Sequence, residues 1–126
     1  MKNLLMLVIL LSTPCWAQAA HDFTATGNDF LARCGRIDLK GDDSVTLICA
    51  AYVGGVADGM ELMYGVALAK PDKRIFCVPA SGVTRVQILG VVIEFIKAHP
   101  ATAHLQTRTL ILDAMMDAFG CAKTSH

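Results

Sequence analysis

The sequence lacks an excess of charge of either sign. Lysine and arginine together number 11, and aspartate and glutamate together also number 11, in a chain of 126 residues. A protein that binds nucleic acid or an anionic membrane needs a basic surface. The composition therefore gives no support for either partner and favours a soluble protein whose specificity is local.

Metal and phosphate motifs are missing as well. No CxxC or HxxxH pair occurs, and the cysteines are widely scattered, so zinc binding is the weaker interpretation of them. The Gly54-Gly55 pair lies in an apolar, helix-like stretch rather than between a strand and a helix, which argues against a phosphate-binding loop. We expect neither a metal nor another cofactor.

The first residues have the pattern of a secretory signal. Lys2 precedes an apolar stretch over residues 4–11, which Pro14 interrupts, and Ala17-Gln18-Ala19 has the small residues that a signal peptidase needs. The apolar stretch is shorter than the roughly 20 residues of a membrane-spanning helix. Lipidation of Cys15 is a second alternative, against which the preceding proline argues.

Cleavage after Ala19 leaves residues 20–126 as one domain. No internal repeat, low-complexity tract or interdomain linker follows the signal. Loss of Lys2 leaves ten basic against eleven acidic side chains. We therefore expect a protein that functions outside the cytoplasm, with no membrane insertion after cleavage.

The spacing of apolar residues predicts an all-α fold, a small bundle of four or slightly more helices. The clearest helix covers residues 85–98, where Thr84 and Gln87 form a capping box and Pro100 follows the end. Apolar residues occupy nearly all sides of this helix, which indicates a central position or an interface.

Three further helices complete the predicted bundle. One begins after Asp42-Asp43, either of which can cap it, and runs through Met63. The others cover about residues 26–33 and 105–119. Glycine costs about 1 kcal/mol in a helix interior. Gly54, Gly55 and Gly59 therefore predict the close approach of another helix.

The helix order predicts the cysteine pairing. Cys34 and Cys49 fall at the same end of the bundle, whereas Cys77 and Cys121 fall at the other end. A disulfide needs α-carbons within about 7 Å, and a helix separates its ends by about 1.5 Å per residue. We predict the disulfides Cys34–Cys49 and Cys77–Cys121, which staple the small domain.

The sequence makes a weak case for an enzyme. His21 and His126 lie at the mature termini, and His99 and His104 flank a turn, so no histidine is placed beside a nucleophile. Asp58 lies among small residues that imply tight packing. Its ordinary interpretation is a bond to a backbone amide or a nearby arginine, and the alternative is presentation to a partner.

Several short stretches together carry a family resemblance. They are Cys49, Tyr52-Val53-Gly54-Gly55-Val56-Ala57-Asp58-Gly59, Phe76-Cys77-Val78-Pro79, Gly82-Val83-Thr84, Gln87-Ile88-Leu89, Val91-Val92, His99-Pro100, Leu110-Ile111 and Ala118-Phe119-Gly120-Cys121. This series resembles the Rap/Tai group of type VI secretion immunity proteins. The resemblance implies a periplasmic helical protein, often dimeric, that binds a peptidoglycan amidase effector and blocks its active site.

A small helical periplasmic chaperone or stress protein without a cognate effector is the alternative function. The helix over residues 85–98 has little polar surface, and Gly55 and Gly59 form another smooth face. Either both faces are buried inside the monomer, or a symmetric homodimer buries one of them against its own copy, and the homodimer is the expectation.

Two connections are the candidate effector contacts. The first is the polar loop between the second and third predicted helices, which contains Lys70, Asp72, Lys73 and Arg74. The proline and cysteine that flank this loop restrict it, so it loses less conformational entropy when it binds a partner. The second is the turn that contains His99 and His104.

Overall fold

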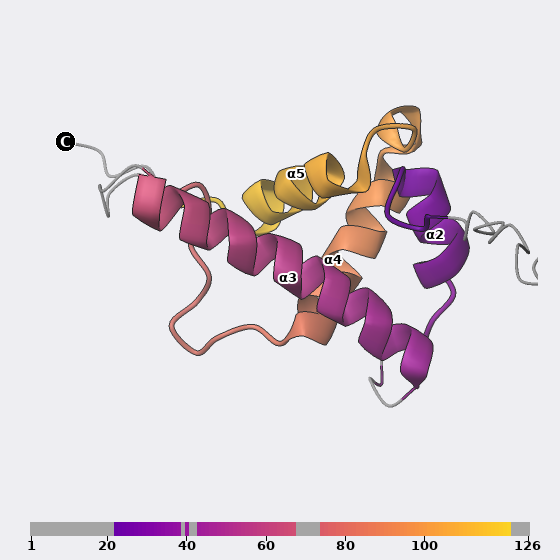
Figure 1. Cartoon of the computed structure of the whole chain (residues 1–126), viewed down its shortest axis with the longest axis horizontal. Helices are drawn as coiled ribbons and strands as arrows, with labels where there is room; N and C mark the ends of the chain where they lie inside the picture. Colours follow the sequence, from indigo (N-terminus) through magenta and orange to yellow (C-terminus); the bar gives the residue numbers. More distant parts are fainter. Residues whose placement is uncertain (1–21, 39, 41–42, 68–73, 122–126) are drawn as a thin grey trace, which may run out of the picture.

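The described part of the chain is an all-α bundle, which confirms the predicted fold class. The computed structural model describes residues 22–38, 40, 43–67 and 74–121. Within these residues lie four α-helices and one short 3-10 turn (Figure 1), namely α2 (Gly27–Cys34), α3 (Ser44–Ala67), α4 (Arg85–Ala98), η1 (Pro100–Thr102) and α5 (Thr107–Phe119). The predicted signal, residues 1–19, lies outside the described residues.

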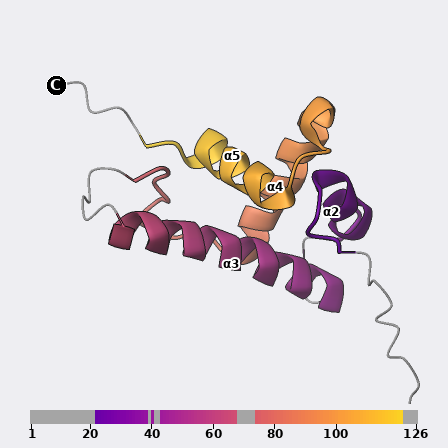
Figure 2. The same cartoon turned by 45° about the horizontal axis from the view of Figure 1, so that its top comes forward.

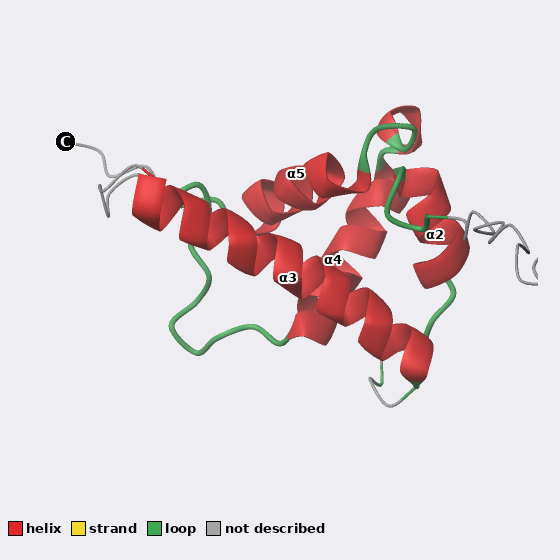
Figure 3. Cartoon of the chain, in the orientation of Figure 1, coloured by secondary structure: helices red, strands yellow, loops and turns green. Residues whose placement is uncertain are grey.

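The helix α3 forms one side of the molecule. Figure 2 shows α2, α4 and α5 on the same side of α3, and all three contact it. The two most extensive contacts among the described helices are those of α4 with α3 and of α4 with α5, so α4 is the central element. Figure 3 shows that loops and turns connect the helices.

Helix α4 forms because its start is capped and its apolar residues are buried. The Thr84 side chain accepts a hydrogen bond from the Gln87 amide, and the Gln87 side chain accepts one from the Thr84 amide. This is the capping box that the sequence predicts. The buried face consists of Ile88, Leu89, Val92, Ile93 and Ile96.

Asp43 caps helix α3. Its carboxylate accepts hydrogen bonds from the amides of Val45 and Thr46, both at 2.9 Å, and from the Thr46 hydroxyl. The Thr46 hydroxyl is the largest cause of a lowered pKa at Asp43. This stabilising contribution is present above the pKa of an unfolded aspartate and is lost as the pH falls through the lowered pKa. Asp42, the other predicted cap, lies outside the described residues.

The glycines of α3 have two different environments. A Cβ at Gly54 would lie 2.7 Å from Cδ of Arg85, so this glycine allows the arginine to cross α3 closely. The expected approach of another chain segment therefore holds at Gly54. At Gly55 and Gly59 the expectation fails within one copy of the chain, because no described atom lies within 4 Å of a Cβ at either position.

Helix α5 begins two residues later than predicted, at Thr107 rather than at residue 105. Gln106 has an extended backbone and pairs with Thr26 in an antiparallel β-bridge. This pairing holds residue 106 out of the helix. It also brings the start of α2 close to the start of α5, where Gly27 is buried.

The structure forms the two disulfides that the helix order predicts. Cys34 joins Cys49 with α-carbons 6.1 Å apart, and Cys77 joins Cys121 with α-carbons 4.9 Å apart. The first bond links α2 to α3 inside the core. The second links the end of α5 to the segment before α4. A backbone hydrogen bond of 2.7 Å from the Cys77 amide to the Phe119 carbonyl supports it.

One segment of α3 passes the length and composition test for a membrane-spanning helix. The segment is Ser44–Tyr64, and 33% of its most apolar window is buried inside the protein. A core helix of a soluble protein passes the same test. The result is therefore weak support for a membrane span.

We predict that Gly27→Ala lowers the free energy of unfolding by about 1–3 kcal/mol. The added Cβ would lie 2.5 Å from Leu110 Cδ1 and 2.9 Å from the Ala103 carbonyl oxygen, so the start of α2 must move. Urea unfolding followed by circular dichroism measures the change. Asn28→Ala is the matched control, because Asn28 is exposed. Equal stability of the two variants would contradict this packing.

The two disulfides should differ in their sensitivity to reductant. Cys34 and Cys49 are fully buried, whereas Cys77 is exposed. Mild reductant applied to the folded protein should therefore release the thiols of Cys77 and Cys121 first. Alkylation followed by peptide mapping checks the order, and the untreated protein after export should show no free thiol among these four cysteines.

Candidate functional site

The predicted contact loop is only partly described. Lys70, Asp72 and Lys73 lie outside the described residues. Arg74 is exposed, and its carbonyl oxygen lies 3.6 Å from Sγ of Cys121. The end of this loop is therefore held against the Cys77–Cys121 disulfide.

The turn over residues 99–104 is fully described and exposes both of its histidines. The His99 ring stacks on the Phe95 ring with centroids 4.3 Å apart, and Nδ1 of His99 donates to the Phe95 carbonyl oxygen at 2.8 Å. His104 is also exposed. The His99 ring is thus held in place by Phe95 of α4.

Backbone hydrogen bonds fix the shape of this turn. The amide and the hydroxyl of Thr102 each donate to the His99 carbonyl oxygen at 3.1 Å. The Asn28 amide donates to the Ala103 carbonyl oxygen at 2.8 Å, and the Gly27 amide donates to the Leu105 carbonyl oxygen at 3.0 Å. The free amides at the start of α2 therefore hold the turn, which projects from the bundle between α4 and α5 (Figure 1).

The structure places the two candidate contacts at opposite ends of α5. The turn over residues 99–104 directly precedes this helix, whereas Arg74 lies beside Cys121, just after its end. A 13-residue helix is about 20 Å long. A partner that touches both contacts would have to cover the whole length of α5.

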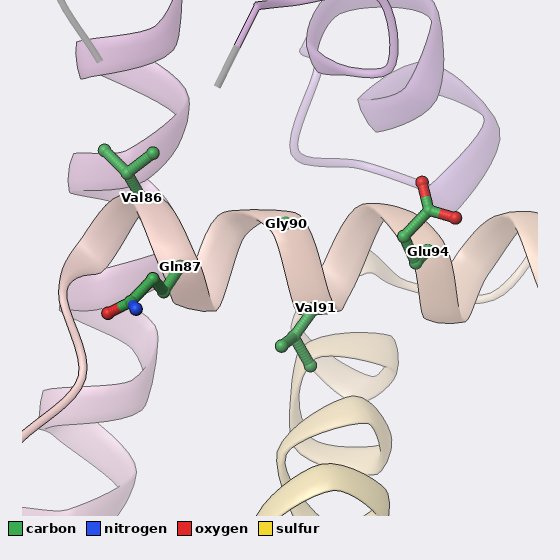
Figure 4. A pocket seen from close by; sticks show the side chains of 5 residues that line it. All are labelled: Val86, Gln87, Gly90, Val91 and Glu94. Carbon is green, nitrogen blue, oxygen red and sulfur yellow. The ribbon is translucent and has the colours of Figure 1, made fainter. Parts of the chain in front are cut away.

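An apolar groove runs along the outer face of α4. It is shallow, has a volume of about 560 Å³ and is lined by Val86, Gln87, Gly90, Val91 and Glu94. Figure 4 shows Gly90 in the middle of this face, with Gln87 and Glu94 on either side of it along the helix. The sequence feature that corresponds to this groove is the apolar surface on nearly all sides of the predicted helix, which indicated a central position or an interface. The groove suits contact with an apolar side chain rather than catalysis.

The outer face of α3 exposes large apolar side chains. Their exposed fractions are 53% for Leu47, 47% for Ile48, and 67% for both Leu62 and Met63. Sequence reasoning identified only the smooth middle of this face. It did not single out the large side chains at the two ends of this face.

Asp58 pairs with Arg85 across the α3–α4 contact. Its Oδ2 atom accepts a hydrogen bond from the arginine at 3.0 Å, and both side chains are largely exposed. The stem of Arg85 lies over Gly54. An exposed ion pair contributes about 0–1 kcal/mol, so its main effect is to orient Arg85. Of the interpretations that the sequence leaves open for Asp58, the structure shows the bond to a nearby arginine.

Within the described ranges, no three His, Cys, Asp or Glu side chains form a group that could hold a metal ion. All four cysteines of the described chain are in disulfides. The features that remain are surfaces: a rigid exposed turn, a loop end, a groove and an apolar helix face. Such features are suited to protein binding.

Comparison with known proteins identifies the family. The family model for Rap1a immunity proteins matches residues 26–121, which is most of the chain and all four described helices. No curated protein and no solved structure matches the sequence. The chain belongs to the Rap1a immunity protein family, and this membership implies a role in immunity to a type VI secretion effector.

Proposed function

We propose that this is a periplasmic immunity protein that binds a type VI secretion peptidoglycan amidase and inhibits it by occluding the active site. The observation that carries the proposal is the family match over residues 26–121. The protein itself acts as an inhibitor and not as an enzyme. Its surface features suit this role, because the rigid exposed turn, the apolar groove on α4 and the apolar face of α3 can each contact another protein.

The proposed compartment follows from the signal and the disulfides. Residues 1–19 have the pattern of a cleavable secretory signal. Structural disulfides persist in the periplasm and are rare in the cytoplasm. A peptidoglycan amidase acts on a periplasmic substrate, so its inhibitor must be present in the same compartment.

The turn over residues 99–104 is the effector contact that the structure favours. It projects from the bundle, and the backbone bonds to Asn28 and Gly27 hold its shape before any partner binds. A prefolded probe loses little conformational entropy on docking, which favours tight binding through a modest interface. We propose that this turn enters the amidase cleft.

The loop that contains Lys70, Asp72, Lys73 and Arg74 is a second proposed contact. Arg74 is exposed. Exposed charges at the edge of an interface change mainly the association rate. We propose that this loop steers the effector while the turn occludes the active site.

We also propose that the protein is a homodimer. The four exposed large apolar side chains on the outer face of α3 support this, because an apolar patch of this kind on a soluble protein marks a protein interface. Occupation of α3 by a second copy leaves the turn over residues 99–104 free for the effector.

A periplasmic chaperone or stress protein is the second candidate function. The same apolar face of α3 favours it, since a chaperone must expose apolar surface. This function predicts partial unfolding and binding of a hydrophobic dye on acidification, as carboxylates such as that of Asp43 become protonated. A fold unchanged down to low pH would exclude it.

Neutralisation of a periplasm-directed amidase tests the proposed function. We expect that co-expression of this protein prevents the cell lysis caused by its cognate periplasm-directed amidase, which is sought first among the products of adjacent genes. A variant without residues 1–19 should not protect, because it stays in the cytoplasm. Purified protein should also inhibit peptidoglycan cleavage by the purified amidase. Full amidase activity in the presence of excess protein would contradict the proposal.

Ala101→Trp tests the proposed contact. Ala101 is exposed at the tip of the turn, so the added indole should leave the fold unchanged and obstruct entry into the cleft. We expect inhibition to weaken roughly tenfold or more, as at an interface hot spot. Ala32→Trp, an exposed site on α2, is the matched control.

The double variant Lys73→Glu/Arg74→Glu tests the loop separately. It should slow association, measured by surface plasmon resonance, and leave dissociation nearly unchanged. Weakening by this variant alone, without an effect of Ala101→Trp, would place the occluding contact in the loop.

A further inference from the structure

Three backbone hydrogen bonds fasten the turn over residues 99–104 and the start of α5 to the start of α2. They run from the amides of Asn28, Gly27 and Thr107 to the carbonyl oxygens of Ala103, Leu105 and Ala25, at 2.8, 3.0 and 3.3 Å respectively. Among the described residues, every hydrogen bond that links this turn to a segment distant in sequence involves residues 25–28.

The turn and α2 depend on each other. The first amides of a helix have no partner within that helix. At α2 the carbonyl oxygens of Ala103 and Leu105 accept hydrogen bonds from two of these amides. The turn therefore completes the start of α2, and its position relative to the bundle follows the position of α2.

Helix α2 is fixed to α3 at its other end. Cys34 is its last residue, and the fully buried Cys34–Cys49 disulfide joins it to α3. Figure 1 and Figure 2 both show α2 between the turn (orange) and the start of α3. An isolated helix of eight residues is too short to be stable in water. The buried Phe30 side chain gives α2 one anchor, and the covalent bond prevents α2 from pivoting about it.

We propose that α2, locked to α3 by the Cys34–Cys49 disulfide, positions the effector contact, so that the turn over residues 99–104 reaches its binding position only when this disulfide is formed. The inference rests on the proposed function, in which the turn occludes the amidase, and adds how that contact is regulated. Cys34 and Cys49 are buried, so they act on the effector only through α2.

The lock follows the redox state of the compartment. The two thiols form the disulfide by giving up two protons and two electrons to the disulfide of a periplasmic thiol oxidase, which is itself reduced to a dithiol. Cytoplasmic thiol systems keep such cysteines reduced. A chain that has not been exported therefore lacks the lock and leaves the turn unfixed, whereas the exported protein holds the turn in place.

Inhibition of the purified cognate amidase by Cys34→Ala/Cys49→Ala tests the lock. The inhibition constant should rise roughly tenfold or more, because only the fraction of molecules with the turn in place can bind. The loss should not change with salt concentration, since the variant alters no charge.

The second disulfide provides the matched control. Cys77–Cys121 joins the end of α5 to the segment before α4, about 20 Å from the turn along α5. Cys77→Ala/Cys121→Ala should weaken inhibition less than the first variant does. Any loss should depend on salt concentration, because this disulfide holds the end of the loop that contains Arg74.

Amide hydrogen exchange tests the positioning without an effector. In Cys34→Ala/Cys49→Ala the amides of Gly27 and Asn28 should exchange roughly tenfold faster or more, because α2 no longer holds the turn. The amide of Val92, inside α4, should keep its protection. This contrast separates displacement of α2 from a general loss of stability, which would speed exchange at every amide.

Graded reduction of the exported protein tests the redox dependence. Inhibition should persist while peptide mapping finds only the thiols of Cys77 and Cys121. It should be lost once the thiols of Cys34 and Cys49 appear, and reoxidation should restore it.

Thr26 tests the same helix without a change to any cysteine. Its hydroxyl accepts a hydrogen bond from the Asp29 amide at 3.3 Å and donates one to the Asp29 carboxylate at 2.6 Å, which caps α2. Thr26→Val removes this cap and should weaken inhibition, whereas Thr26→Ser keeps the hydroxyl and should inhibit like the wild type. This pair decides the question if the cysteine variant does not fold.

Three results would overturn the proposal: inhibition by Cys34→Ala/Cys49→Ala equal to that of the wild type, unchanged exchange at Gly27 and Asn28 in that variant, or equal inhibition by Thr26→Val and Thr26→Ser. A wild-type protein that shows the expected exchange but does not inhibit its cognate amidase would overturn the proposed function and leave the hold of α2 on the turn standing.

Discussion

Five aliphatic side chains of α4 leave water when the chain folds, and α4 contacts each of the other three helices. Their burial contributes on the order of 10 kcal/mol, which is comparable to the net stability of a small domain. The capping box at Thr84 fixes where this helix begins. The positions of α3 and α5 follow, because each must cover part of the same apolar surface.

The two disulfides and the ion pair of Asp58 with Arg85 add links between the helices around this core. Cys34–Cys49 ties α2 to the start of α3, and Cys77–Cys121 ties the end of α5 to the segment before α4. Both ends of the bundle are thus cross-linked, while the exposed ion pair sets the direction of one side chain. Rigidity is useful in an inhibitor, because an ordered surface loses little entropy on binding.

Much of the fold could be predicted because its signals are local. The Thr84–Gln87 capping box, the aspartate before α3 and the order of the helices all follow from residues close in sequence. The start of α5 could not be predicted, since it depends on the pairing of Gln106 with Thr26, 80 positions away.

The environment of Gly55 could not be predicted either. A small residue in a helix indicates close contact, but the pattern does not say whether the contact lies within one chain. For the same reason the sequence named both candidate contacts without showing that they lie at opposite ends of α5.

The hydrogen bonds that hold the turn over residues 99–104 come largely from backbone groups, and two of the donors are the amides at the start of α2. Side chains at exposed positions such as Ala101 and His104 take no part in those bonds. Their identity can therefore change while the loop keeps its shape. A lineage that meets a new effector could alter its specificity at these positions and retain the same scaffold, so relatives should diverge at the tip of the turn sooner than at Gly27 beneath it.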